Sequence, residues 1–251
     1  MSMTNQAHTG NAGSSGDQKK AGGAGSSASS TKMLRAMVGI GAVCALMIVL
    51  TFEGTKSRIA ELKAEALEQA IFKVLPGTVT KATYLLDDKN TFSHSNGDEK
   101  EVKLVYAGFD AKGELIGIAI EASGIGFADV LRILYGYDPA TQKIIGFYVL
   151  DSKETPGLGD KIEKDPIFLA NFTALDVELA SDFSKLKNSV VTVKSGNQEN
   201  DWEIDGITGA TISSRAIGDI MESSTNYWMP LIYKNKDVFQ IQSLDHEKTQ
   251  K

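Results

Sequence analysis

The longest apolar run of the chain lies near its N-terminus, between Met33 and Phe52, and only Arg35 interrupts it. About 20 consecutive apolar residues are enough for a helix to cross the hydrocarbon core of a bilayer. The run is apolar on every side, unlike an amphipathic core helix. No Ala-x-Ala-like site follows it, unlike a cleaved signal peptide. Of these three interpretations the pattern favours a transmembrane helix, which we place at residues 33–53.

Polar segments flank the apolar run on both sides. Residues 1–32 are mostly Gly, Ser, Ala, Asn, Gln and Thr, and we predict a disordered tail because they bury too little apolar surface to fold. Lys and Arg are more frequent before the run than after it, which places the N-terminus in the cytoplasm. Residues 54–76 predict a membrane-proximal helix that ends at Pro76 and Gly77. Its apolar positions follow helical spacing: Ile59, Leu62, Ala66, Leu67, Ala70, Ile71 and Val74.

Strand-like patterns begin beyond residue 100, whereas residues 79–95 are mostly polar and give no clear pattern. The connections at 110–113 and 138–141 have turn composition, so we predict antiparallel hairpins. The glycine-rich segment 123–127 predicts a turn or bulge that interrupts the strands. The four predicted strands are residues 102–109, 115–121, 131–137 and 144–150.

Helical signals return in the second half of the chain. Asp165 and Pro166 predict the start of a short helix that ends at Phe172, and residues 189–194 predict one more strand. A last helix is predicted up to Pro230, with one apolar face: Ile217, Ile220, Met221, Ser224, Tyr227 and Trp228.

The complete pattern predicts an α+β fold. One N-terminal transmembrane helix precedes an extracytoplasmic domain at residues 77–234, in which helices pack on an antiparallel sheet. Residues 235–251 form a polar C-terminal tail in this interpretation, which we expect to fray.

Composition excludes several classes of site. The net charge is −6 and the pI is near 5.2, so the chain lacks the basic character of a nucleic-acid-binding protein. Cys44 is the only cysteine, which excludes an intrachain disulfide, a cysteine zinc site and an iron–sulfur cluster. The three histidines, His8, His94 and His246, lie far apart in polar surroundings. We therefore expect neither a metal site nor a nucleic-acid partner.

A small polar loop, residues 205–214, directly precedes the last predicted helix and contains two glycines and four hydroxyl side chains. Glycine allows positive φ and a close approach of a ligand. Ser213 or Ser214 is the predicted N-cap of the helix. Backbone N–H groups at a helix N-terminus suit a phosphate. The alternative is an ordinary turn and cap.

The residues Asp205-x-x-Thr208-Gly209-Ala210-Thr211 resemble the sequence at which a flavin transferase esterifies the last hydroxyl with FMN. This resemblance implies that Thr211 carries FMN through a phosphodiester and that Thr208 contacts the phosphate, together with Ser213 or Ser214. Gly209 and Ala210 would provide clearance, and Asp205 would belong to the recognition sequence. No base neighbours Thr211 in sequence, as expected if a separate transferase activates it. No catalytic residue of its own is expected.

A second motif, Glu154-Thr155-Pro156-Gly157-Leu158-Gly159, lies about fifty residues upstream. Taken alone it is consistent with a surface loop. It matches, however, the hallmark loop of flavin-binding domains in Rnf complexes and in sodium-pumping NADH–quinone reductases. The resemblance implies that Glu154, Thr155, Leu158 and Gly159 border the isoalloxazine ring. Trp202 is either a core aromatic or a flavin neighbour.

With both motifs, the anchor and the closing helix, the chain resembles the G-subunit family of Rnf-type ion-translocating electron-transport complexes. The resemblance implies an electron-transfer subunit in the bacterial cytoplasmic membrane. The whole complex would couple ferredoxin and NAD redox chemistry to ion movement, and the isolated chain would carry electrons without complete turnover. Other membrane subunits and the flavin transferase would be its partners.

Three alternatives remain open at this point. The first is the C subunit of a sodium-pumping NADH–quinone reductase, which has the same cofactor chemistry. The second is a stand-alone extracytoplasmic flavin reductase. The third, from another functional class, is a redox-inert membrane-anchored binding module whose glycine loops serve only its shape.

Overall fold

The computed structural model describes residues 30–95 and 103–240. The chain divides into two units, Met1–Ser57 and Arg58–Lys251. The apolar run lies in α1 (Ser30–Val74), a single continuous helix that replaces the two helices predicted at 33–53 and 54–76. Among the described residues, α1 is the one helix that is long and apolar enough to cross a membrane. Most of the predicted N-terminal tail and residues 241–251 lie outside the described parts of the chain.

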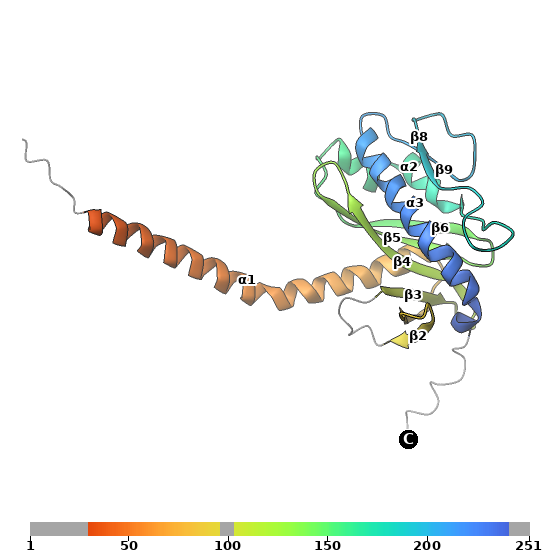
Figure 1. Ribbon diagram of the computed structural model, residues 1–251, viewed down its shortest axis with the longest axis horizontal. Helices are drawn as coiled ribbons and strands as arrows, with labels where there is room; N and C mark the ends of the chain where they lie inside the picture. The colour runs from red at the N-terminus through yellow and green to blue at the C-terminus, as the bar shows by residue number, and fades with distance from the viewer. Residues whose placement is uncertain (1–29, 96–102, 241–251) are drawn as a thin grey trace, which may run out of the picture. The chain divides into compact units, whose positions relative to one another are not determined.

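The second unit is built on a seven-stranded antiparallel sheet with the order β2-β1-β3-β4-β5-β6-β7 (Figure 1). The predicted strands at 102–109, 115–121, 131–137 and 144–150 correspond to β3 to β6. Strands β1 and β2 fall in the region that gave no sequence pattern. The strands are β1 (Thr80–Leu86), β2 (Phe92–Ser95), β3 (Lys103–Phe109), β4 (Leu115–Ile125), β5 (Val130–Asp138), β6 (Lys143–Asp151) and β7 (Leu175–Asp176).

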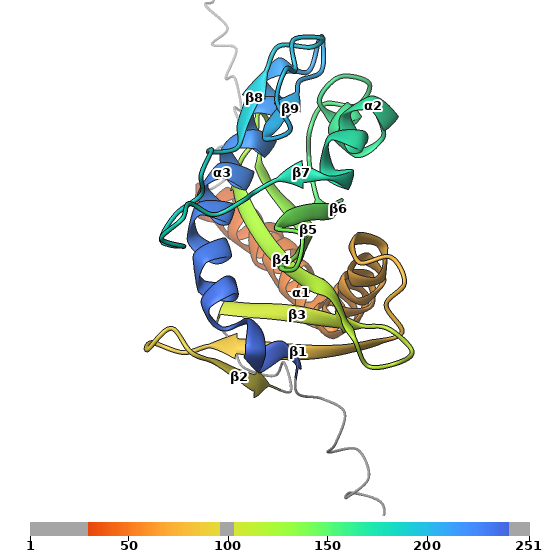
Figure 2. The ribbon, with the colours of Figure 1, turned by 90° about the vertical axis from the view of Figure 1, so that its right-hand side faces the viewer.

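The two faces of the sheet are covered by different helices (Figure 2). Ala119 and Leu134 pack with the C-terminal end of α1, around Ile71. The next residues along the same strands, Ile120 and Tyr135, belong to the larger core under α3 (Thr211–Lys234). Successive side chains of a strand point to opposite faces. The sheet therefore separates a small core from a large one.

The end of α1 fits closely onto the sheet because two glycines leave room for it. Gly136 and Gly146 are partners on the neighbouring strands β5 and β6. A Cβ atom at either position would overlap the backbone carbonyl oxygen of Val74. Upstream in α1, by contrast, Ile59 and Leu62 are each 47% exposed. Only the last part of the apolar face predicted for this helix is therefore buried.

The turn expected at residues 123–127 is shorter than predicted. Strand β4 continues to Ile125, which pairs with Val130 of β5. The turn itself is closed by a hydrogen bond from the Gly126 N–H to the Asp129 carbonyl oxygen, at 2.9 Å. Segment 123–125 is extended because β5 supplies a partner for it along its whole length.

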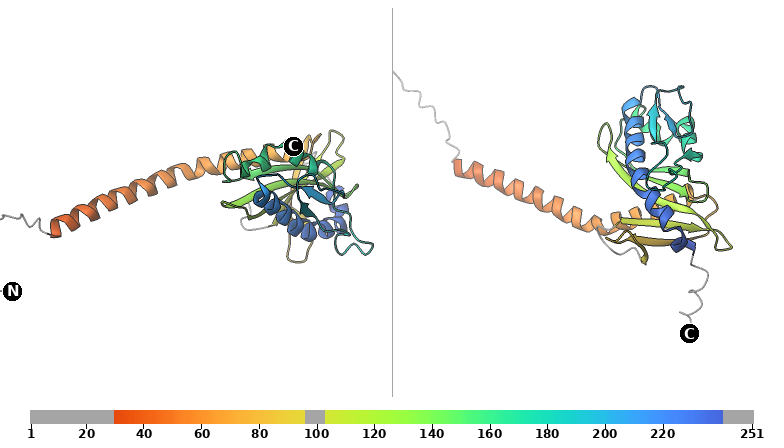
Figure 3. Two further views of the ribbon diagram at one scale, coloured as in Figure 1. Left: turned by 90° about the horizontal axis from the view of Figure 1, so that it is seen from above. Right: turned by 45° about the vertical axis from the view of Figure 1, so that its right-hand side comes forward.

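Short elements follow the sheet. The Asp165 side chain accepts hydrogen bonds from the N–H groups of Ile167 and Phe168 and caps the short helix, as predicted. Strands β8 and β9 form a separate parallel pair next to α3 (Figure 3). The elements are η1 (Gly159–Glu163), α2 (Pro166–Ala170), η2 (Asn171–Thr173), β8 (Val191–Val193) and β9 (Glu203–Asp205).

The C-terminal part of the domain differs from the prediction in two ways. Helix α3 continues past Pro230 to Lys234, because burial of residues such as Met229 and Ile232 outweighs the hydrogen bond that proline cannot make. The expected polar tail begins with a further turn, η3 (Lys236–Gln240). Its Phe239 is fully buried, with its ring centroid 4.9 Å from that of Phe92.

Candidate functional site

The two sequence motifs meet at one cavity of about 330 Å³, a size within the range of small-molecule sites. Three segments form it: the β4–β5 turn, the loop after β6 and the start of α3. All the predicted contacts line the cavity except Thr208 and Ser214. Phe127 and Ile212 line it without having been predicted as contacts. The lining residues are Phe127, Glu154, Thr155, Leu158, Gly159, Gly209, Ala210, Thr211, Ile212 and Ser213.

Helix α3 begins earlier than the sequence suggested. Its N-cap position is Ala210, which has no capping side chain, so the prediction that Ser213 or Ser214 caps the helix is wrong. The backbone makes a tight turn at Gly209, where φ is +85°, and the Ala210 N–H donates to the Ile207 carbonyl oxygen at 3.1 Å. This turn starts the helix before the serines and leaves both of them buried in its first turn.

The start of α3 is a suitable place for an anion. The backbone N–H groups of Thr211, Ile212 and Ser213 belong to the first turn, where no acceptor exists within the helix. The helix dipole adds positive potential at this end. The Thr211 side chain is exposed, and space for a Cβ atom at Gly209 is open. The residue that the motif predicts as the acceptor, Thr211, is therefore accessible from solution.

Glu154 connects the three segments of the cavity. Its side chain is 5% exposed. Oε1 accepts hydrogen bonds from the N–H groups of Phe127 and Ala128, at 2.7 and 3.1 Å. Oε2 accepts a hydrogen bond from the Ser213 hydroxyl at 2.6 Å. One carboxylate thus ties the β4–β5 turn and the first turn of α3 to the loop that carries it.

Two glycines make the space that this carboxylate occupies. A Cβ atom at Gly126 would overlap Oε1 of Glu154, and one at Gly159 would lie 2.5 Å from Oε2. Gly159 is the last residue of the Glu154–Gly159 motif, and the closeness of the carboxylate explains why this position is a glycine. Gly126 lies in the glycine-rich segment 123–127, and it shapes the cavity by leaving room for the carboxylate.

The loop between Glu154 and Gly159 has its own internal support. Gly157 adopts a φ of +79°, and its N–H donates to Oδ1 of Asp160 at 2.7 Å. The other oxygen of Asp160 accepts a hydrogen bond from Lys164 at 2.7 Å. This bond lowers the pKa of the Asp160 carboxyl below its ordinary value.

The mouth of the cavity is apolar and open. Phe127, Leu158 and Ile212 come from the three different segments and are 64%, 52% and 57% exposed. Large apolar side chains gathered at one exposed site are typical of a binding surface. They give the cavity apolar lining in addition to the polar groups of Glu154 and Ser213.

Four candidates from the sequence lie outside the cavity lining, and Thr208, the first of them, is exposed. Asp205 accepts a hydrogen bond from the Gly196 N–H at 2.7 Å and thereby supports the preceding loop. The Ser214 hydroxyl donates to the Ala210 carbonyl oxygen at 3.0 Å and lies 3.3 Å from the Ile207 N–H, which donates to it. Trp202 is half-buried and does not border the cavity. No group of three potential metal ligands occurs among the described residues.

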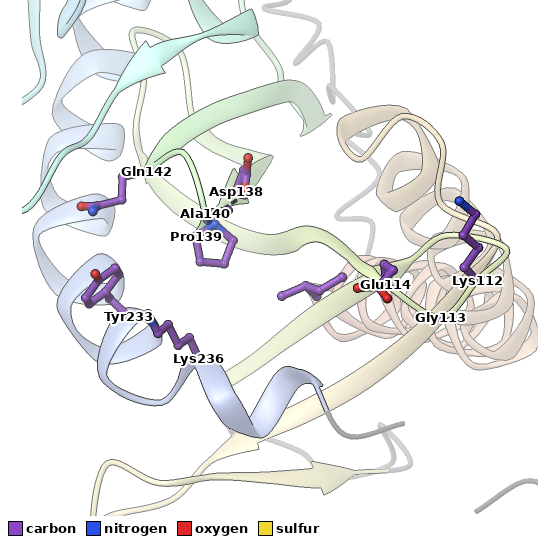
Figure 4. Close-up of a pocket in the computed structure, with 10 residues that line it drawn as sticks. Lys112, Gly113, Glu114, Asp138, Pro139, Ala140, Gln142, Tyr233 and Lys236 are labelled. Atoms are coloured by element: carbon purple, nitrogen blue, oxygen red, sulfur yellow. Dashed lines mark hydrogen bonds between the residues drawn. The ribbon is translucent and has the colours of Figure 1, made fainter. Parts of the chain in front are cut away.

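A larger cavity, of about 510 Å³, lies elsewhere on the domain (Figure 4). Lys112 and Glu114 lie on one side of it, and Tyr233 and Lys236 lie on the other. Asp138 also borders it, but its Oδ1 already accepts a hydrogen bond from the Ala140 N–H at 2.8 Å. Charges of both signs are spread around its wall, and no motif residue reaches it. The smaller cavity is therefore the candidate site.

Comparison with known proteins agrees with this choice. Residues 126–226 match the model of the FMN-binding domain family, and this range contains the whole lining of the candidate cavity. The fold is shared with a crystal structure of the C subunit of the Na(+)-translocating NADH-quinone reductase from Parabacteroides distasonis. The TM-score is 0.53 at 20% identity, over 69% of this chain and 96% of that one.

Two relatives cover most of the chain. It is 33% identical over 197 residues to the G subunit of the ion-translocating oxidoreductase complex of Methanosarcina acetivorans, covering 78% of this chain and 93% of that protein. It is 30% identical over 181 residues to the G subunit of the Na(+)-translocating ferredoxin:NAD(+) oxidoreductase complex of Acetobacterium woodii, covering 71% and 81%. The chain therefore belongs to the family of ion-translocating oxidoreductase complex G subunits, and it contains an FMN-binding domain.

Proposed function

We propose that the chain is the electron-transfer subunit of a membrane-bound Rnf-type complex, which couples ferredoxin and NAD redox chemistry to ion translocation, and that FMN is attached to Thr211. The observation that carries the proposal is the meeting of the two motifs at one cavity, with Thr211 exposed at the start of α3. The names of the G-subunit relatives support the setting in a complex.

The residues of the cavity suit both the phosphate and the ring of FMN. The free N–H groups of the first turn of α3 would hold the phosphate. The apolar side chains of Phe127, Leu158 and Ile212 would contact the flat ring. When bound, FMN supplies one- and two-electron transfer, while the protein sets its position and surroundings.

The geometry changes the roles given to some hydroxyl groups. Those of Ser213 and Ser214 are already hydrogen-bonded within the domain. We therefore assign the phosphate to the backbone of the first turn, where these serines act by fixing its position. Thr208 is exposed next to that turn, and its hydroxyl is a further candidate phosphate contact. Gly209 and Ala210 leave the approach to Thr211 open.

The membrane helix suggests why the flavin would be attached covalently. In this proposal α1 crosses the membrane with the N-terminus in the cytoplasm and the domain on the extracytoplasmic side. A flavin that dissociated there would diffuse away, whereas an ester bond retains it whatever its affinity. A flavin transferase would form the bond, and other membrane subunits of the complex would exchange electrons with the flavin.

The proposal is tested by detecting covalently bound flavin and mapping the residue that carries it. The full chain is co-expressed with an active flavin transferase, as wild type, Thr211→Ala and Thr155→Ala. Thr155 is a matched control because it is another exposed threonine of the same cavity. We expect in-gel flavin fluorescence from wild type and Thr155→Ala, with an FMN-sized adduct that peptide mapping places on Thr211. We expect no fluorescence from Thr211→Ala.

Three outcomes would contradict the proposal. Covalent flavin retained in Thr211→Ala would show that another residue is the acceptor. A dark wild-type band, with a control substrate flavinylated by the same transferase, would favour the redox-inert binding module. Turnover of an electron acceptor by the purified chain alone would favour the stand-alone reductase.

A further inference from the structure

Glu154 differs from every other acidic residue that the structure describes, because its carboxyl group is almost completely buried. The remaining buried polar side chains in the described regions are hydroxyls: Ser95, Ser213, Ser214 and Thr225. Burying a charge is costly unless hydrogen bonds or an opposite charge compensate it. A buried carboxyl group in the wall of a ligand cavity therefore suggests a role beyond solubility.

The hydrogen bonds of Glu154 are those of a carboxylate, and they come from neutral groups. Two backbone N–H groups and the Ser213 hydroxyl donate to it. None of the ion pairs among the described residues includes it. The neighbouring Lys153 pairs with Asp129, and Lys164 pairs with Asp160. The cavity wall thus holds a negative charge without a paired cation.

Such a charge acts strongly on whatever occupies the cavity, because the surroundings are less polarisable than water. Resting on the proposed function, we infer that Glu154 lowers the reduction potential of the flavin held in this cavity. In mildly alkaline solution, reduction takes two electrons and one proton from a donor and leaves the ring with a net negative charge. A fixed carboxylate in the wall makes that added charge less favourable.

The same carboxylate also connects three segments of the cavity. One substitution can separate this structural role from the effect of its charge on the flavin. In Glu154→Gln the amide oxygen can still accept from the Phe127 and Ala128 N–H groups. The amide nitrogen can donate to the Ser213 oxygen, which then acts as acceptor. Glu154→Gln therefore keeps the shape and the three hydrogen bonds but removes the charge.

The experiment compares flavin-loaded wild type, Glu154→Gln and a control, Glu203→Gln. Glu203 also accepts hydrogen bonds from backbone N–H groups, those of Glu199 and Asn200 at 2.8 and 3.1 Å, but it does not line the cavity. The midpoint potential of each full-length protein is measured by equilibrium titration against a reference dye in mildly alkaline buffer. Thermal unfolding of the same samples is recorded in parallel.

We expect Glu154→Gln to raise the ratio of reduced to oxidised flavin about tenfold at a fixed potential, which is a shift of about +30 mV for two electrons. Glu203→Gln should leave the midpoint unchanged, and both variants should unfold near the wild-type temperature. An unchanged or lower midpoint potential in a folded, flavin-loaded Glu154→Gln protein would overturn this inference but leave the proposed function standing.

Two further outcomes would also decide the question. A Glu154→Gln protein that does not fold would overturn the inference, because the charge would then serve the fold. Wild-type protein that takes up no flavin would overturn the proposed function and this inference with it.

Discussion

Two contacts in the domain depend on glycine, and they differ in what the glycine faces. At the end of α1, Gly136 and Gly146 face the backbone of Val74. At the cavity, Gly126 and Gly159 face the carboxylate of Glu154. The first contact packs helix backbone directly on sheet backbone and joins the end of α1 to strands β5 and β6. The second is polar and joins three loop or helix ends.

The two contacts differ in how well they tolerate a change of residue. A backbone carbonyl in a packed helix cannot move without moving the helix, so the first contact has a single arrangement. A hydrogen-bonded side chain can be replaced by another acceptor of similar shape. We therefore expect substitutions at the helix contact to cost more stability than substitutions at the cavity.

The largest effect is expected for Gly146→Ala. Its added methyl would overlap the Val74 carbonyl oxygen, so the helix end must shift, at a cost of about 3 kcal/mol in the free energy of unfolding. The measurement is denaturant unfolding of the full chain in detergent. The control is Gly124→Ala on β4, whose methyl would meet the Ile220 side chain at 2.5 Å, which can change rotamer. Equal losses for both variants would contradict the distinction between backbone and side-chain contacts.

An intermediate effect is expected for Ser213→Ala. The substitution removes a hydrogen bond to the Glu154 carboxylate, which contributes about 1.5 kcal/mol to the free energy of unfolding. Ser224→Ala is the control on the same helix, because its hydroxyl shares a 2.6 Å hydrogen bond with the neutral Tyr135 phenol. Unfolding experiments should show the smaller loss for Ser224→Ala. The reverse order would argue against a charge on Glu154.

The smallest effect is expected for Asp160→Asn, and it depends on pH. The pKa of Asp160 is lowered in the folded domain, first by the Lys164 hydrogen bond, so its contribution to stability is present above the pKa of the unfolded chain. That contribution disappears as the pH falls through the lower, folded pKa. The unfolding temperatures of wild type and Asp160→Asn should therefore differ slightly at neutral pH and converge in acid. A gap that persists in acid would contradict this.

The sequence predicts the centre of the sheet better than its edge. Strands β3 to β6 have long apolar segments and turn residues between them, and these features alone place them. In β1 the buried Ala82, Tyr84 and Leu86 alternate with residues such as Thr83, within a mostly polar region. This strand is recognisable only once β3 pairs with it and Phe239 covers Tyr84. Those partners are distant in sequence.

At the candidate site, too, contacts between residues distant in sequence could not be predicted. The motifs identify the segments around the cavity, but they do not indicate that Glu154 and Ser213 form a hydrogen bond across 59 positions of the chain. Ser213 and Ser214 have the composition of helix caps. They are buried instead because the turn at Gly209 starts α3 earlier. Positive φ at a glycine is a property of the folded backbone, which local composition does not reveal.

The burial of Phe239 has a consequence for how fast the domain folds. Its ring packs against Tyr84 and Phe92, so the first two strands of the sheet are completed by the last described turn. Contacts between such distant parts of a chain require the closure of a long loop, and they are associated with slow folding. The aromatic contact that covers β1 and β2 can therefore form only after the rest of the domain has been synthesised.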